Sequence, residues 1–201
     1  NYYLIEEQIR VVRHHLPKNF GKGLPPLASP HNCPRIYDIA SEAVAHADGR
    51  WDPTSLTHYI QSYQKVTPLT LRELCALPGM LRLALIENLR RVSICVAEAQ
   101  KERNLADMWV KRISDCAENK PADLIMVTAE MARSRPPLSS AFVAEMVRRL
   151  QDRGKMLSLP LTWVEQRLAE KGITTEQVIH RCNQQLASSH LSVSNSITGL
   201  R

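Results

Sequence analysis

The chain has 201 residues, of which 44 % are hydrophobic, a size and composition that suit one globular domain or two small ones. It holds no run of about 18 apolar residues, and charged residues interrupt its first 16 positions, so we predict neither a membrane span nor a signal peptide. The 26 lysines and arginines outnumber the 20 acidic residues, but they lie in short pairs among acids, which favours solvated helix faces over a nucleic-acid-binding patch.

The five cysteines are odd in number and widely scattered, and we expect them on buried helix faces. This pattern predicts unpaired thiols in a reducing compartment and argues against a disulfide framework.

Apolar residues three or four positions apart predict an amphipathic helix at 2–16. Five prolines and two glycines in 17–34 predict an extended, irregular connector. A second helix is expected at 36–47, ended by Asp48 and Gly49. Asp52 is well placed to cap a third helix, with Pro53 at its first position, that runs to about residue 66.

After Pro68, Thr70 and Glu73 match a capping box, and we predict a short fourth helix that ends near Pro78-Gly79. No glycine or proline lies between Gly79 and Pro121, which predicts the longest helix of the chain, roughly 50 to 60 Å if unbroken. The polar stretch 101–104 leaves a bend or an interruption open. Its predicted buried stripe is Leu81, Leu85, Leu89, Val92, Val96, Ala99, Ala106, Trp109, Ile113 and Cys116.

Further helices are predicted at 121–133, from Ser139 or Ser140 to 152 with Gly154 at its end, and from Pro160 to Gly172. Thr174 and Gln177 form a second capping box that opens a helix through residue 186, and the serine-rich 188–196 is frayed helix or coil.

No segment has the alternation of a strand, so the predicted class is all-α. We expect an irregular multi-helix bundle of about eight or nine helices with one long central helix and Pro/Gly-rich connectors. The domain expected is 1–201, with 1–120 and 121–201 as possible sub-modules.

A search for reactive groups assigns no catalytic, cofactor-binding or metal-binding residue. His14 and His15 are adjacent and point about 100° apart on a helix, so they cannot chelate one ion. His31 and Cys33 lack the second ligand pair that zinc needs. The glycines form no phosphate loop, and Asp48 with Asp52 is better explained as a turn and a cap.

The aromatic residues can be explained in two ways. They can stack on sugar rings, or they can pack between helices, and their spacing favours packing. The residues concerned are Trp51, Tyr59, Tyr63, Trp109 and Trp163.

Long colinear stretches carry a family resemblance. They include 2–28, YYLIEEQIRVVRHHLPKNFGKGLPPLA, and 34–93, which starts PRIYDIASEAVAHADGRWDP. They continue with RPPLSSAFVAEMVRRLQDRG, LTWVEQRLAEKGITTEQVIHRCNQQ and HLSVSNSITGLR. These stretches resemble the amino-terminal region of cyclic β-1,2-glucan synthases, upstream of the membrane-embedded transferase, and the weakest match is 101–134.

The resemblance implies a fragment of a very large bacterial inner-membrane enzyme that builds and cyclises β-1,2-glucan from UDP-glucose. The family's transferase and phosphorylase-like motifs are not in this chain, and none of its five tyrosines is assigned as glucan acceptor. The absence of an initial methionine and the end at Arg201 fit an excised fragment.

We expect a noncatalytic module on the cytoplasmic face. Its expected partners are the other domains of the parent, with no nucleic acid, and it would meet the membrane only through the parent. The alternative is a free-standing helical adaptor that binds protein or nucleic acid.

Overall fold

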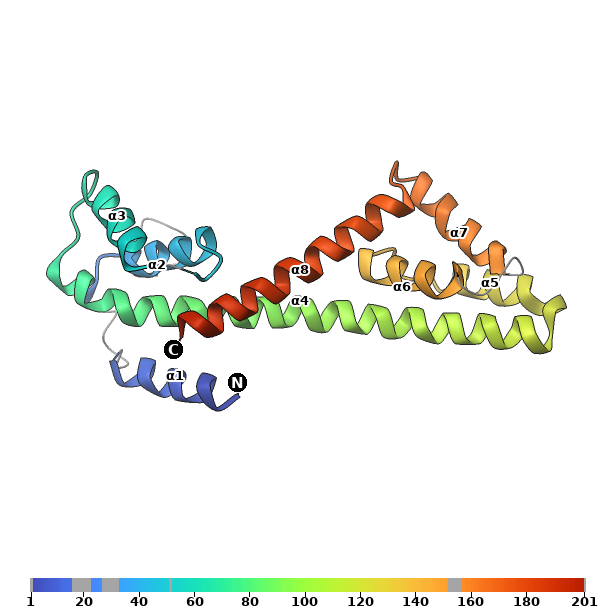
Figure 1. Ribbon diagram of the computed structural model, residues 1–201, viewed down its shortest axis with the longest axis horizontal. Helices are drawn as coiled ribbons and strands as arrows, with labels where there is room; N and C mark the ends of the chain where they lie inside the picture. The colour runs from blue at the N-terminus through green and yellow to red at the C-terminus, as the bar shows by residue number, and fades with distance from the viewer. Residues whose placement is uncertain (1, 16–22, 27–32, 51, 152–156, 201) are drawn as a thin grey trace. The chain divides into compact units, whose positions relative to one another are not determined.

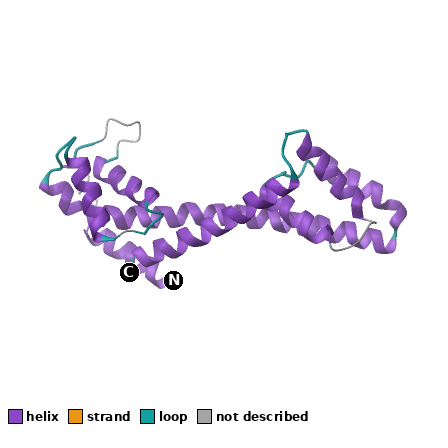
Figure 2. Cartoon of the chain, turned by 45° about the horizontal axis from the view of Figure 1, so that its top comes forward, coloured by secondary structure: helices purple, strands orange, loops and turns teal. Residues whose placement is uncertain are grey.

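The computed structural model describes residues 2–15, 23–26, 33–50, 52–151 and 157–200. Within these ranges the chain forms eight α-helices joined by loops and one short 3₁₀ helix, and it has no strand (Figures 1 and 2). An isolated antiparallel bridge joins Pro26 to Pro34 in the connector that follows the first helix. The predicted all-α class is therefore confirmed. The elements are α1 Tyr2–His15, α2 Arg35–His46, α3 Pro53–Gln64, α4 Leu71–Asn119, η2 Pro121–Asp123, α5 Leu124–Arg133, α6 Ser140–Gln151, α7 Ser158–Ala169 and α8 Thr175–Gly199.

The chain divides into two compact units. Unit 1 comprises Asn1–Ser93 and Ser189–Arg201, and unit 2 comprises Ile94–Ser188. The divisions fall inside α4 and α8, so each of these long helices contributes to both units. They differ from the division at residue 120 considered from the sequence.

Four of the predicted helix ends are confirmed by their capping interactions. Oδ1 of Asp52 accepts hydrogen bonds from the backbone N–H of Thr54 and of Ser55, both at 2.9 Å. The capping boxes are reciprocal at Thr70 with Glu73 and at Thr174 with Gln177, each side chain bonding the other residue's backbone N–H. Gly172 has a φ of +68° after α7, and N–H groups around it bond the last carbonyls of that helix, which is a Schellman motif.

The prediction that a helix ends near Pro78-Gly79 is wrong, because α4 continues through Pro78 to Asn119. A proline inside a helix removes one hydrogen bond and costs about 3 kcal/mol. Pro78 itself is exposed, while buried residues continue the same stripe on both sides of it. These residues, Ala76, Met80, Leu81, Ala84 and Leu85, all join one hydrophobic core, and their burial offsets the cost. The helix is also unbroken across 101–104, the point that the sequence left open.

The serine-rich tail is neither frayed nor coil, because α8 extends through it to Gly199. Ser192 and Ser196 are buried there, and both accept hydrogen bonds from the side-chain amide of Asn88 on α4, at 3.1 and 3.0 Å. Gly49 also packs tightly here, since an added Cβ would lie 2.8 Å from Oγ of Ser196. The small serines thus let α8 approach its neighbours closely within unit 1.

Each unit has its own hydrophobic core. The core of unit 1 is formed by α2, by the first part of α4 and by single residues from other segments, among them Leu24 of the connector and Leu200. In unit 2, Phe142, Val143, Met146, Val147 and Leu150 of α6 are buried together with Trp109 and Ile113 of α4 and with Val164 and Leu168 of α7. Val96, predicted as buried, is exposed between the two core-forming parts of α4.

No disulfide joins any of the five cysteines, all of which lie in the described ranges. Cys182 is buried and Cys33 and Cys116 are half-buried, but Cys75 and Cys95 are exposed. The expectation that all five lie on buried helix faces is therefore wrong for these two, which lie on α4 outside its buried stripe, and for Cys33, which precedes α2 in the connector.

An ion pair between α2 and the start of α4 is buried in unit 1. Arg35 donates to both carboxylate oxygens of Glu73, from Nε at 2.6 Å and from Nη2 at 2.9 Å, and the Glu73 side chain is fully buried. The same carboxylate accepts hydrogen bonds from the backbone N–H and the hydroxyl of Thr70. Glu73 therefore caps its own helix and fastens α2 to it.

Acid is expected to destabilise unit 1 through this carboxylate. The Arg35 guanidinium holds the pKa of Glu73 at about 2, well below its usual value of 4.5. The folded state therefore binds fewer protons than the unfolded state between these values. The stabilisation is complete above about pH 4.5 and is lost as the pH falls towards 2. Urea denaturation at a series of pH values measures the effect. Glu73→Gln should be less stable at neutral pH and should lose less stability on acidification, and an equal acid loss in this variant would contradict the assignment.

Candidate functional site

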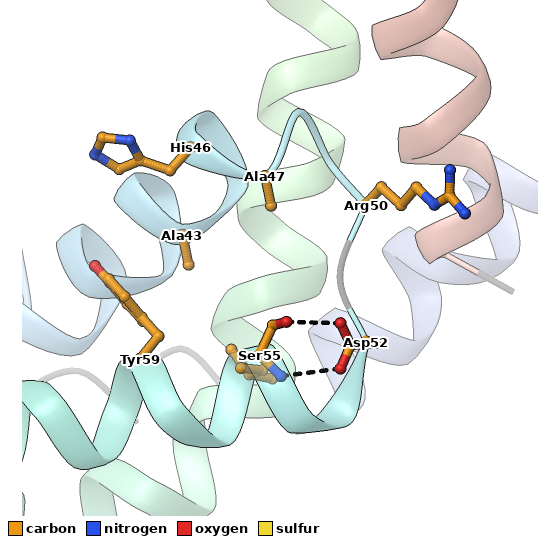
Figure 3. A pocket seen from close by; sticks show the side chains of 8 residues that line it. Ala43, His46, Ala47, Arg50, Asp52, Ser55 and Tyr59 are labelled. Carbon is orange, nitrogen blue, oxygen red and sulfur yellow. Dashed lines mark hydrogen bonds between the residues drawn. The ribbon is translucent and has the colours of Figure 1, made fainter.

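A pocket of about 270 Å³ lies between α2, α3 and the turn that joins them (Figure 3). Its apolar lining comes from Ala43 of α2, from Ala47 directly after that helix and from Leu56 of α3. The polar residues come from the end of α2, from the turn and from the first two turns of α3. The lining residues are Ala43, His46, Ala47, Arg50, Asp52, Ser55, Leu56 and Tyr59.

Most polar atoms of this pocket already have structural partners. Asp52 caps α3 and also accepts a hydrogen bond from the Ser55 hydroxyl at 2.6 Å, as the dashed lines in Figure 3 show. These bonds, led by that of Ser55, lower the pKa of Asp52 and keep it ionised. The Tyr59 hydroxyl donates to the carbonyl of Ile39 at 3.5 Å, and burial raises its pKa.

The remaining polar groups of the α2–α3 pocket do not converge. Nε2 of His46 lies 3.5 Å from a carboxylate oxygen of Glu42, and the Arg50 guanidinium extends away from Asp52 (Figure 3). General acid–base catalysis requires a titratable group within hydrogen-bond reach of the reacting atom. The one carboxylate that lines this pocket, Asp52, instead accepts the hydrogen bonds of a helix cap.

Unit 2 has two further pockets. One of about 430 Å³ lies between α4 and α6 and combines acids and bases, namely Asp107, Lys111, Asp115 and Arg149 with Val110 and Ser114. A smaller one of about 190 Å³ is formed by the segment after α5 and by α7. Its lining residues are Ala132, Arg135, Pro136, Leu138, Trp163, Arg167, Glu170 and Lys171.

The histidines and cysteines singled out in the sequence are not assembled into a site. His31 lies outside the described residues, as does the side chain of His15. Among the side chains that the structure does describe, no group of three or more His, Cys, Asp or Glu is arranged to hold a metal ion. That no residue is catalytic or binds a cofactor or a metal stays a prediction.

The described aromatic residues pack on the hydrophobic cores, as their spacing predicts, and one of them also lines a pocket. Trp109 is buried in the core of unit 2, and Tyr59 and Tyr63 pack against the core of unit 1, while Trp51 lies outside the described residues. Trp163 packs on the core of unit 2 and also lines the smaller pocket there. The three cations beside it, Arg135, Arg167 and Lys171, were not singled out, because they lie up to 36 positions apart in the sequence.

The basic pairs lie on helix surfaces beside acids, as the sequence predicts. Arg90 pairs with Glu87 and Arg112 with Glu130, both at 2.6 Å, and Arg149 pairs with Asp107 and Glu145. These three arginines are therefore paired with acids at separate places on the helix surfaces and do not form one basic patch.

Comparison with known proteins gives one informative result. No family model matches the chain. The chain is 29 % identical, over 202 aligned positions and its whole length, to the cyclic β-(1,2)-glucan synthase NdvB of Rhizobium meliloti. The predicted resemblance to a cyclic β-1,2-glucan synthase is confirmed. The chain spans 7 % of the length of NdvB, so the similarity covers a small part of that protein. The free-standing adaptor is accordingly not favoured.

Among the described helices, none has the length and the apolar composition needed to cross a membrane.

Proposed function

We propose that this chain is a noncatalytic helical segment of a large glucan synthase and that its partners are other domains of the same enzyme. The observation that carries the proposal is the end-to-end similarity to NdvB, which is interrupted by no unmatched domain in this chain. In the parent, we place the segment on the cytoplasmic face of the bacterial inner membrane, next to the transferase that uses UDP-glucose. The family resemblance supports this placement.

The interactions that the carboxylates make support a scaffold role. Catalytic acids and bases have displaced pKa values because they are poised for proton transfer. Here the pKa of Glu73 is lowered by Arg35 and that of Glu87 by Arg90, and both are held in ion pairs between or along helices. Asp52 is held in a helix cap. These carboxylates are thus engaged in bonds that stabilise the fold.

Exposed apolar residues support contact with other domains. On α5, Ile125 is 70 % exposed and Met126 is 68 % exposed, and Ala129, one turn further along the same face, is exposed too. This outward face of α5 is apolar, although helices of soluble domains usually present polar residues to solvent. Contiguous apolar surface of this kind is typical of interaction sites.

Turnover by the isolated chain tests the noncatalytic part of the proposal. The chain incubated with UDP-glucose is expected to release no UDP and to transfer no glucose to an oligosaccharide above the rate of a heat-denatured sample. Sustained transfer or hydrolysis would overturn it. Salt-dependent binding to DNA or RNA would instead support the adaptor.

A binding measurement tests the partner. The chain is expected to associate with the remainder of its synthase when the two are produced as separate polypeptides. Ile125→Ser with Met126→Ser should weaken this association and leave the melting temperature nearly unchanged, because exposed substitutions alter stability by less than about 0.5 kcal/mol. Lys101→Ser, on an exposed position of α4, is the matched control. Equal association of both variants would exclude the outward face of α5 as the contact.

A further inference from the structure

The smaller pocket of unit 2, which we name the α7 pocket, lies where two helices end. Arg135 belongs to the segment that follows α5, and Glu170 and Lys171 follow the last residue of α7. Trp163 and Arg167 lie on α7 itself, one helical turn apart. The pocket thus places an indole ring next to three cations and one carboxylate.

Trp163 gives the α7 pocket an apolar wall of fixed position. The residue is partly buried against the core of unit 2 and also lines the pocket. The C–H groups of a pyranose ring form a flat apolar face, and an aromatic side chain supplies a rigid surface for it at little conformational cost. Trp163 is therefore the lining residue suited to stacking on a sugar.

The charged residues around Trp163 leave donors available. Arg167 donates to Glu170 at 2.8 Å, so these two side chains hold each other in place at the rim. Arg135 and Lys171 have no ion-pair or hydrogen-bond partner for their side chains among the described residues. Sugar hydroxyls accept hydrogen bonds from such cations and donate to a carboxylate such as that of Glu170.

The backbone at Arg135 is strained. Its φ is +47°, in the left-handed region that residues with a side chain rarely adopt, and it precedes Pro136, which further restricts the allowed conformations. A glycine at 135 would relieve the left-handed conformation. Strained residues of this kind cluster at ligand sites, where the strained conformation fixes a side chain in place.

The α7 pocket keeps a small net positive charge. The carboxyl ends of α5 and α7 both lie at the α7 pocket, and each carries a partial negative charge of about half a unit. These partial charges, together with Glu170, offset about two of the three cationic charges. What remains is a weakly positive pocket with several donors and some acceptors, which can bond the hydroxyls of an uncharged sugar.

We infer that the α7 pocket binds a glucosyl unit of a β-glucan chain, with Trp163 stacked on the ring and with Arg135, Lys171 and Glu170 bonded to its hydroxyls. The identity of the sugar rests on the proposed function, because the relative's product is a β-(1,2)-glucan. The segment then holds part of the glucan that its parent synthesises.

Titration of the 201-residue chain with a β-1,2-linked glucose oligosaccharide, followed by NMR, tests the inference. Saturable binding should shift the indole N–H resonance of Trp163 and leave that of the buried Trp109 in place. Lys171→Met should weaken binding roughly tenfold or more, because each hydrogen bond to a charged group contributes about 1.5–3 kcal/mol. Lys101→Met, a lysine of α4 outside the pocket, should bind like the parent chain.

Arg135→Gly separates a ligand role from a structural one. It should weaken binding to a similar degree while the melting temperature is kept or raised, since glycine accepts the positive φ. Unchanged affinity in both pocket variants would overturn the inference, as would a shift at Trp109 alone or saturation by inorganic phosphate at this pocket. These outcomes leave the proposed function standing, because turnover and association with the rest of the synthase are measured independently.

Discussion

Replacement of Arg35 by methionine is expected to lower the free energy of unfolding by about 3–5 kcal/mol. The substitution leaves the fully buried Glu73 carboxylate without its two charged hydrogen bonds, at 2.6 and 2.9 Å. It also removes the hydrogen bond from Arg35 to the carbonyl of Pro68 at 2.9 Å. A buried charge that loses its partner costs far more than an exposed pair is worth. Urea denaturation at neutral pH, followed by circular dichroism, measures the loss.

Arg90→Met is the matched control for this ion pair. Arg90 forms a bidentate pair with Glu87 of similar geometry, but the Arg90 side chain is exposed and Glu87 is only half-buried, so the loss should be much smaller than that of Arg35→Met. If the two variants lost equal stability, Thr70 alone would suffice to hold the Glu73 carboxylate, and the ion pair would contribute nothing to the docking of α2.

Local chemistry made the helix starts predictable. The cap at Asp52 and the boxes at Thr70 and Thr174 involve residues within three positions of one another, so the sequence contains the whole interaction. Gly172 was predictable for the same reason, since a left-handed residue after α7 favours glycine. The all-α class followed from these signals and from helical periodicity.

Tertiary contacts decided the features that the sequence missed. Pro78 predicts a break, yet burial on both sides of it holds α4 together, and no local rule contains that burial. Ser192 and Ser196 predict a weak tail, but Asn88, more than 100 positions earlier, satisfies both hydroxyls. Glu73 was recognised as a cap, whereas its bond to Arg35 crosses 38 positions and has no sequence signature.

The same limit applies to the candidate sites. Spacing rules find ligands that share a helix, as in metal or phosphate motifs. The α7 pocket instead joins Arg135 to Lys171 through the packing of α5 and α7, and only its strained Arg-Pro-Pro sequence marks it locally. Trp163 was considered for sugar stacking and for packing, and its ring takes part in the core of unit 2 while it also lines a pocket.

Truncation of Leu85 to alanine is expected to lower the free energy of unfolding by about 2–5 kcal/mol. Leu85 is 1 % exposed within the core of unit 1, and its methyl groups lie under the end of α8, where a Cβ added at Gly199 would be 3.3 Å from Cδ1. A Cβ added at Gly199 would also lie 3.0 Å from the carbonyl oxygen of Gly49, so this end of α8 is closely packed and the surroundings cannot easily collapse into the space. The cost should therefore lie in the upper half of the range, since it rises with the cavity that remains.

Leu71→Ala provides the comparison, because it removes the same atoms from the same helix at a position that is 78 % exposed. Its effect should stay within about 0.5 kcal/mol. Chemical denaturation of the two variants in parallel compares them directly. The difference between them isolates burial from helix propensity, since both exchange leucine for alanine in α4. Equal losses would mean that the stripe through Leu85 is not the surface on which α2 and the end of α8 are held, and the core of unit 1 would have to be reassigned.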